Sequence, residues 1–314
     1  MDTHTLLRRM VPVPASSSVA PPPPQGIQRH FIQTDNGDLE ILSAQPLKRT
    51  SKPSLLFIHG GFGSALCYRH YLKYFAARGY YSYAVSLRGH GNSWQPGYWR
   101  MYWMPREEFL KDILAGIKYV EGEDQTGPPV LLGHSAGGGL VQEVAARGDV
   151  QIRGAALIAA LPGSGSWRVN WNWLWMDPLM LLRFSWHQFH PRSPLSSTAL
   201  VKRAFFSSLT DSEVKSVERT MPPWESMTWA WSMFWKFVDP AKVVKGMGKG
   251  MLVVAAVEDR LVGTNIPEGT ALWYRKYGGN VEFAVVEDVG HHLMLDKHWI
   301  GGAHVVRHWL EGLD

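Results

Sequence analysis

The chain has 314 residues, of which 45% are hydrophobic and 19% charged, a balance that supplies ample apolar material for a folded core. The net charge is +5, but the lysines and arginines are scattered rather than grouped, which argues against a nucleic-acid surface. Cys67 is the only cysteine, so an intrachain disulfide and a multi-cysteine zinc site are excluded. We expect no metal and no cofactor.

The N-terminal 25 residues differ in composition from the rest. They end in four consecutive prolines, Pro21 to Pro24, and their apolar run is too short and too interrupted for a secretory signal, so we expect a disordered leader over residues 1–25. Two arginines, several serines and little acid leave a transit peptide as an alternative. No stretch of the sequence reaches the roughly 18 apolar residues that cross a bilayer. We therefore expect a cytoplasmic protein.

Strand-like and helix-like segments alternate along most of the chain. Runs at residues 30–34 and 39–42 flank the turn-rich sequence Asp35-Asn36-Gly37-Asp38, which predicts a hairpin. Because later strands alternate with helices, the pattern predicts a mostly parallel sheet covered by helices on both faces. The later strands are expected at 54–58, 81–87, 130–132, 154–160, 251–257 and 281–286, and helices near 66–78, 105–121, 267–277 and 296–310.

This alternation stops between residues 163 and 245, where nine of the 15 tryptophans lie. We predict an inserted helical cap over 163–245, and an α/β core formed by residues 26–162 and 246–314. A cap this aromatic would surround a hydrophobic substrate with rigid apolar walls. Candidate substrate-binding residues include Trp171, Trp175 and Trp231. Two alternatives remain: the tryptophans bury one helix face, or they dock on a membrane or a partner chain.

A strand-like run leads directly into Gly133-His134-Ser135-Ala136-Gly137, and a helix-like segment follows. This is the strand, sharp turn and helix context that the G-x-S-x-G signature requires. A serine at the tip of so tight a turn has a strained backbone, and side chains two residues away on either side would collide. The pattern therefore predicts that Ser135 is a nucleophile.

A nucleophilic serine needs a base, and the base needs an acid that orients it and stabilises its positive charge. Asp259 follows the strand predicted at 251–257, and His291 follows the strand predicted at 281–286. Loops at the carboxyl ends of parallel strands gather over one crevice, so we expect Ser135, Asp259 and His291 to converge there. The adjacent Glu258 and His292 are the alternative acid and base.

Five segments, in this order, resemble motifs of the α/β-hydrolase superfamily. They are the oxyanion loop His59–Phe62, the R-G-H-G-x-S element Arg88–Ser93, the nucleophile elbow Gly133–Gly137, the acid loop Glu258–Val262 and the histidine loop Gly290–Asp296. The resemblance covers roughly residues 27–312 and is strongest to cap-bearing esterases, lipases and lysophospholipases. It implies an α/β-hydrolase fold with helices on both faces of the sheet.

The resemblance also implies an oxyanion hole made by the backbone N–H of Ala136 and that of Gly61 or Phe62. Relatives often have an aspartate where this sequence has Ser86. We expect His59 and His90 to hydrogen-bond loops beneath the site, and Cys67 to pack, with pocket lining as its alternative.

Together these features predict a serine hydrolase that acts on a hydrophobic ester, lactone or thioester through an acyl-enzyme. A serine nucleophile argues against the dehalogenase and epoxide hydrolase chemistries, which use an aspartate. One alternative is an enzyme of the same fold that cyclises, condenses or cleaves carbon skeletons in secondary metabolism. Another is a non-catalytic ligand-binding member. The expected partner is a small hydrophobic substrate rather than a nucleic acid, and the sequence indicates no oligomeric state.

Overall fold

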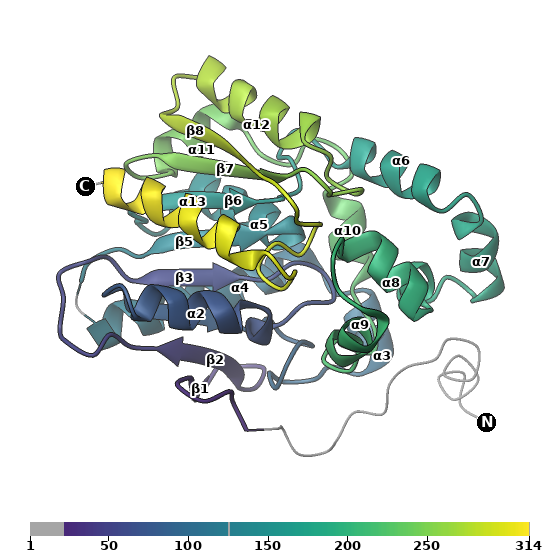
Figure 1. The fold of residues 1–314 in the computed structure, drawn as a ribbon, viewed down its shortest axis with the longest axis horizontal. Helices are drawn as coiled ribbons and strands as arrows, with labels where there is room; N and C mark the ends of the chain where they lie inside the picture. The colour runs from purple at the N-terminus through teal and green to yellow at the C-terminus, as the bar shows by residue number, and fades with distance from the viewer. Residues whose placement is uncertain (1–21, 125, 314) are drawn as a thin grey trace.

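The structure, a computed structural model, describes residues 22–124 and 126–313 and is built on one eight-stranded sheet (Figure 1). Most of the expected disordered leader, up to residue 21, lies outside the described residues. The strand order is β1-β2-β4-β3-β5-β6-β7-β8. The strands are β1 Gln28–Ile32, β2 Leu39–Ala44, β3 Leu55–Ile58, β4 Ser82–Val85, β5 Val130–His134, β6 Gly154–Ile158, β7 Met251–Ala256 and β8 Val281–Val286.

The sheet is antiparallel at one edge and parallel elsewhere. β1 and β2 form the predicted hairpin, and β2 also pairs antiparallel with β4. All other neighbouring strands are parallel. The inner strands β3, β5, β6 and β7 are buried along their whole length, which explains why they are apolar runs without alternation. The predicted mostly parallel sheet is confirmed.

Helices cover both faces of the sheet, each over its own apolar cluster. On one face α2 and α13 pack over a cluster that includes Phe57, Phe75 and Trp309 (Figure 1). On the other face the cluster includes Ile113 of α4 and Leu140 of α5. The helices and 3₁₀ turn of the core are η1 Ala65–Tyr68, α2 Arg69–Ala76, α3 Tyr98–Tyr102, α4 Arg106–Asp124, α5 Ser135–Arg147, α12 Asn265–Lys276 and α13 Trp299–Gly312.

The closing helix α13 contains a Gly301-Gly302 pair but is continuous. A Cβ built at Gly302 would lie 2.3 Å from the Tyr71 hydroxyl oxygen. A side chain at position 302 would therefore require the buried Tyr71 ring of α2 to shift.

The fully described segment 163–245, called the cap segment below, contains helices and loops between β6 and β7. Its first helices lie beyond the carboxyl ends of the strands (Figure 1), whereas its last helix packs on α5. The elements are α6 Trp167–Met176, α7 Met180–Trp186, η2 Ser193–Leu195, α8 Thr198–Phe205, α9 Asp211–Glu218, α10 Met227–Ser232 and α11 Pro240–Gly246.

Among the described residues, no helix combines the length and the apolar character that a membrane crossing requires.

Candidate active site

Ser135 lies at the junction of β5 and α5 with a backbone φ of 51°, in the left-handed region that costs energy for a non-glycine residue. Glycines make this turn sterically feasible. A Cβ at Gly137 would lie 2.2 Å from the His59 carbonyl oxygen, and one at Gly133 would lie 2.6 Å from the Gly138 Cα. The Ser135 side chain is left partly exposed at the carboxyl end of the sheet.

His291 and Asp259 are buried next to each other. The His291 Nδ1 lies 2.7 Å from the Asp259 Oδ2, and the Asp259 Oδ1 accepts hydrogen bonds from the backbone N–H groups of Leu261 and Val262, both at 2.8 Å. The backbone thus fixes the carboxylate, and the carboxylate fixes the imidazole with Nδ1–H as donor and the Nε2 lone pair free. The predicted acid loop and histidine loop therefore meet at this end of the sheet.

The alternative acid and base lie in different surroundings. The Glu258 side chain is exposed on the surface. The His292 ring packs 4.6 Å from the Phe205 ring, centroid to centroid, and burial beside His291 lowers the pKa of His292 to about 3. His292 is therefore a neutral packing residue at pH 7.

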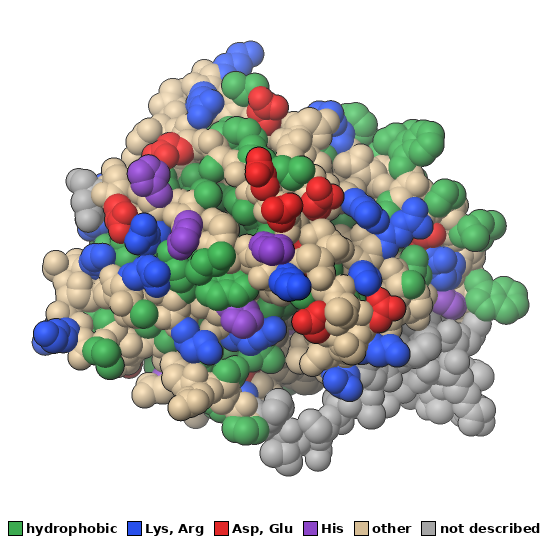
Figure 2. Space-filling view, in the orientation of Figure 1, with side chains coloured by type: hydrophobic (Ala, Val, Ile, Leu, Met, Phe, Trp, Pro, Cys, Tyr) green, Lys and Arg blue, Asp and Glu red, His purple; other side chains and the backbone are tan. Residues whose placement is uncertain are grey.

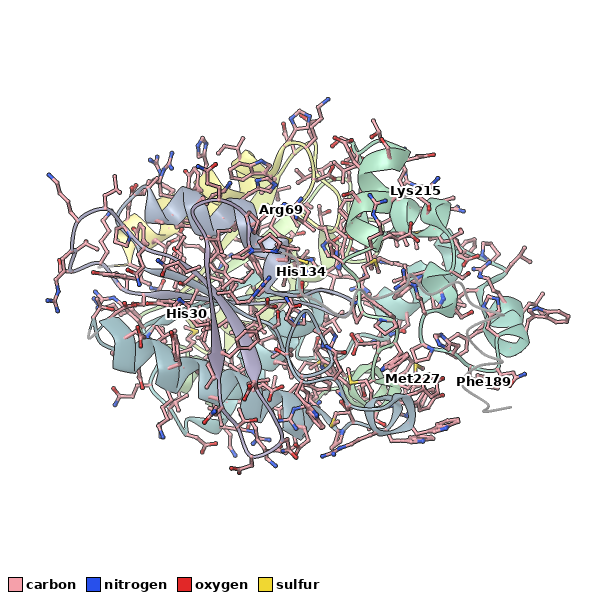
Figure 3. The ribbon with its side chains drawn as sticks, turned by 90° about the horizontal axis from the view of Figure 1, so that it is seen from below. His30, Arg69, His134, Phe189, Lys215 and Met227 are labelled. Carbon is pink, nitrogen blue, oxygen red and sulfur yellow. The ribbon has the colours of Figure 1, made fainter. Side chains whose placement is uncertain are left out.

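His134, the variable residue before the serine, lies at the centre of the molecule (Figure 3). Its Nε2–H donates to the His291 backbone carbonyl oxygen at 2.9 Å, which joins the serine turn to the histidine loop. Burial and the neighbouring His291 and His292 lower the pKa of His134 well below its usual value, so the ring stays neutral. The G-x-S-x-G motif specifies no residue at this position, so the sequence predicts no role for His134.

The predicted oxyanion loop contacts an acid that no sequence motif indicates. Glu225, in the cap segment just before α10, is buried, and its Oε2 accepts the Phe62 backbone N–H at 2.9 Å. The same oxygen lies 2.8 Å from the His90 Nε2. Burial lowers the pKa of His90, but the Glu225 carboxylate outweighs this and raises it above the usual value. Glu225 therefore anchors the cap segment both to the oxyanion loop and to the loop that carries His90.

His59 connects the oxyanion loop to the backbone at Leu87. Its Nδ1–H donates to the Gly60 carbonyl oxygen at 2.8 Å, and its Nε2 accepts the Leu87 backbone N–H at 3.0 Å. The expectation that His59 and His90 hydrogen-bond loops beneath the site is confirmed.

Ser86, where the family resemblance implies an aspartate, hydrogen-bonds to a carboxylate from the neighbouring strand. Its hydroxyl donates to the Glu40 Oε2 at 2.8 Å and accepts the Ala65 backbone N–H at 3.0 Å. The Glu40 Oε2 also accepts the Asn92 backbone N–H at 3.1 Å, and Arg29 pairs with Glu40. Glu40 thus supplies from β2 the negative charge that position 86 lacks.

A small cavity lies between the oxyanion loop and the cap segment, and Cys67 contributes to its wall as well as to the core. Its lining includes Phe62, Cys67, Phe205, Met221 and His292.

The cap tryptophans named as candidates for substrate binding are mostly exposed: Trp171 by 56%, Trp175 by 72% and Trp231 by 71%. Burial of a helix face, one alternative for them, does not hold, whereas Trp229 is fully buried. Their part in substrate binding stays a prediction. Among residues 22–124 and 126–313, no group of three or more His, Cys, Asp or Glu side chains is placed to hold a metal ion.

Comparison with known proteins identifies the family of this chain. The family model described as "Alpha/beta hydrolase family" matches residues 55–300, which is most of the chain. The chain belongs to the α/β-hydrolase family. A monoacylglycerol lipase of Mycolicibacterium smegmatis is 34% identical to this α/β hydrolase over 93 residues, 30% of this chain and 32% of that protein. The match thus spans about a third of that curated relative.

Solved structures show the same fold. A carboxyl esterase from Bacillus coagulans superimposes with a TM-score of 0.66 at 14% identity, covering 92% of this chain and 99% of that one. A putative aryl esterase from Burkholderia cenocepacia gives a TM-score of 0.65 at 17% identity, with 91% and 99% covered. At these identities the likeness concerns the fold.

Asp296 joins the cap segment of this α/β hydrolase to its histidine loop. Its fully buried carboxylate accepts backbone N–H groups from Ser207 at 2.9 Å, Ser208 at 3.2 Å, Gly290 at 2.8 Å and Lys297 at 2.9 Å. Burial alone would raise the pKa of Asp296, but these donors outweigh it and lower the pKa below the usual 3.8.

We expect Asp296→Asn to lower the free energy of unfolding at pH 7 by about 2 kcal/mol, because a neutral amide replaces a charged acceptor of several hydrogen bonds. A carboxylate with a depressed pKa stabilises the fold above its unfolded pKa, and this contribution is lost as pH falls through the folded pKa. The difference in the free energy of unfolding between wild type and variant should therefore become smaller below about pH 3.8. Urea unfolding from pH 3 to pH 7 measures it.

The matched control is Asp288→Asn, an exposed carboxylate close by in the chain with a positive φ of 58° that asparagine tolerates. This control should leave stability nearly unchanged at every pH. An equal loss for Asp296→Asn at pH 3 and pH 7 would contradict the assigned role of its charge.

Proposed function

We propose that this α/β hydrolase cleaves a hydrophobic ester, lactone or thioester through an acyl-enzyme. In this proposal Ser135 is the nucleophile, His291 the base and Asp259 the acid that orients it. The single observation that carries the proposal is the buried hydrogen bond of 2.7 Å between the His291 Nδ1 and the Asp259 Oδ2, on loops that converge with the strained serine turn. That arrangement supplies what a serine hydroxyl needs to lose its proton.

The reaction follows from this arrangement. The Ser135 Oγ attacks the carbonyl carbon while its proton passes to the His291 Nε2, and Asp259 stabilises the imidazolium. Collapse of the tetrahedral intermediate breaks the bond to the leaving group, which takes the proton from His291. Water then attacks the acyl-enzyme, gives its proton to His291, and releases the acid and the Ser135 hydroxyl.

For the oxyanion hole we propose the backbone N–H groups of Ala136 and Gly61. Phe62 was the alternative to Gly61, but its N–H already donates to the Glu225 carboxylate at 2.9 Å. Gly61 and Ala136 are both partly exposed, as is Ser135. Donors held rigidly by the protein stabilise the charge that develops on the carbonyl oxygen.

A hydrophobic substrate is supported by the surroundings of the site. The side chains between the oxyanion loop and the cap segment are mainly apolar, among them Phe62, Phe205 and Met221. The partial match to a monoacylglycerol lipase also favours an ester with an apolar acyl group. A cytoplasmic location stays a prediction.

We expect a fluorophosphonate to label Ser135 alone, because only a serine beside a base is nucleophilic enough to displace fluoride. Mass spectrometry of the peptide that contains Ser135 measures the adduct. Ser135→Ala should abolish both the label and the hydrolysis of apolar p-nitrophenyl esters, and His291→Ala should abolish the label. An unlabelled wild-type protein would overturn the hydrolase proposal and favour carbon-skeleton chemistry or ligand binding.

We expect Asp259→Asn to lower kcat for ester hydrolysis by about 10⁴-fold, because asparagine favours the wrong imidazole tautomer. Glu258→Gln is the matched control, since Glu258 is exposed next to it and should leave kcat within about twofold. Steady-state kinetics on one p-nitrophenyl ester compares the two variants. A large loss of kcat in Glu258→Gln with little loss in Asp259→Asn would identify Glu258 as the acid instead.

We expect Glu225→Ala to lower kcat by about tenfold or more, short of the roughly hundredfold that follows loss of a complete oxyanion donor. Glu225 acts as a positioning residue, so KM should change little, and Glu225→Gln, which keeps an acceptor oxygen for Phe62, should restore part of kcat. Both variants should lower the His90 pKa, since the carboxylate raises it. NMR titration of the His90 ring measures this shift, and an unchanged kcat with an unchanged pKa would remove Glu225 from this role.

A further inference from the structure

The cap segment carries an apolar surface that the rest of the described chain does not cover. α7 has the sequence Met-Leu-Leu-Arg-Phe-Ser-Trp, yet it contains no buried residue. In α6, Trp167, Trp171 and Trp175 recur every four residues and are all exposed, so they form one stripe. A single exposed leucine or tryptophan is ordinary, but a contiguous apolar surface marks an interaction site.

We call this the α6–α7 surface and define it by its large exposed side chains. They are Trp167, Trp171, Trp175, Leu179, Leu181, Leu182, Trp186 and Phe189.

The α6–α7 surface lies at one end of the molecule, away from the candidate active site. In Figure 1, α6 and α7 project beyond the sheet, and Figure 2 shows hydrophobic side chains along that edge. Phe189, just after α7, lies at the far end of the cap segment, whereas His134 lies at the centre (Figure 3). The surface therefore faces outward and is available to a large partner.

The exposed charge of this region is positive. The fully described residues 163–196 contain one acidic residue, Asp177, which is buried and forms an ion pair with Arg183. Arg168 is exposed beside Trp167, and Arg192 is buried. The surface thus combines apolar side chains with a cation and presents no exposed carboxylate. The whole chain has a net charge of +5, which adds a long-range attraction to anions.

This composition fits a lipid surface better than a second copy of the chain. Tryptophan favours the membrane interface, because its ring is apolar while its N–H reaches polar headgroups. In a symmetric dimer the same surface would meet itself, and the exposed Arg168 would find no exposed carboxylate on the facing copy of that surface. An anionic headgroup supplies the missing counter-charge.

We propose that the α6–α7 surface docks this protein on an anionic phospholipid bilayer. The apolar side chains enter the boundary between headgroups and acyl chains, about 5–10 Å deep, as in other amphipathic membrane-surface helices. Docking is peripheral, and the cytoplasmic location expected from the sequence would place the protein against an anionic leaflet. The proposal does not depend on the chemistry at Ser135.

Vesicle flotation with the full chain tests the proposal. The Ser135→Ala protein is used so that no lipid is hydrolysed, with vesicles of phosphatidylcholine alone or mixed with phosphatidylglycerol. We expect binding to the mixed vesicles, weaker binding to phosphatidylcholine alone, and a loss of affinity with added salt. Failure to bind the mixed vesicles, or equal binding to both compositions, would overturn the anionic bilayer as the partner.

Paired variants assign the binding to this surface. Leu182→Ser with Trp186→Ser should weaken vesicle binding by about tenfold or more, since both side chains lose the apolar area that they would bury in the bilayer. Leu182 is 71% and Trp186 74% exposed, so circular dichroism and the melting temperature should be unchanged. The matched control is Leu47→Ser with Leu272→Ser. Both leucines are exposed and lie outside the cap segment, so this variant should bind vesicles like the parent protein.

Two further results would overturn the proposal. One is undiminished vesicle binding by the Leu182 and Trp186 double variant. The other is a protein that binds no vesicles and is a dimer in analytical ultracentrifugation, while the double variant is a monomer. That result would make the surface a contact between copies of the chain. Fluorophosphonate labelling of Ser135 is measured without vesicles, so failure of the proposed hydrolase activity is distinguished from failure of docking.

Discussion

The site depends on a close approach of backbone to backbone at the end of β5. The helix that begins at Ser135 passes so near the end of β3 that a Cβ at Gly137 would lie 2.2 Å from the His59 carbonyl oxygen. On the other side, a Cβ at Gly60 would lie 2.7 Å from the Ser135 Cβ. Glycine at these positions lets the serine turn and the oxyanion loop share one small space, and the strain at Ser135 is held by the packed sheet around it.

Two buried carboxylates join the cap segment to the core, and each holds a loop of the site. Glu225 comes from the cap segment and contacts the oxyanion loop, while Asp296 comes from the core and contacts the end of α8. Each satisfies backbone N–H groups that would otherwise be buried without a partner, which is costly. The site is thus held from both sides of the boundary between core and cap segment.

Much of this arrangement could be predicted from local patterns. The sheet, the hairpin and the serine turn follow from apolar runs, turn residues and glycine spacing over short stretches, and the loops of Asp259 and His291 follow from parallel strand order. Glu225 could not be predicted, because it meets Phe62 from 163 positions away and no periodicity selects it within the cap segment. The five-residue helix α3 was also missed, since so short a helix has too few turns to show a pattern.

The Glu40 and Ser86 contact has a consequence for how this sequence can vary. The Ser86 hydroxyl donates to the Glu40 Oε2 at 2.8 Å. A Cβ at Gly91 would lie 2.5 Å from the Glu40 Oε2 and 2.5 Å from the Ser86 Oγ, so the space between these residues holds a single carboxylate. An aspartate at position 86 would bring two buried like charges together while Glu40 remains. Positions 40 and 86 are therefore epistatic. The acidic residue can move from position 40 to position 86 only when both positions are substituted together, and the effect of a substitution at one position depends on the residue at the other.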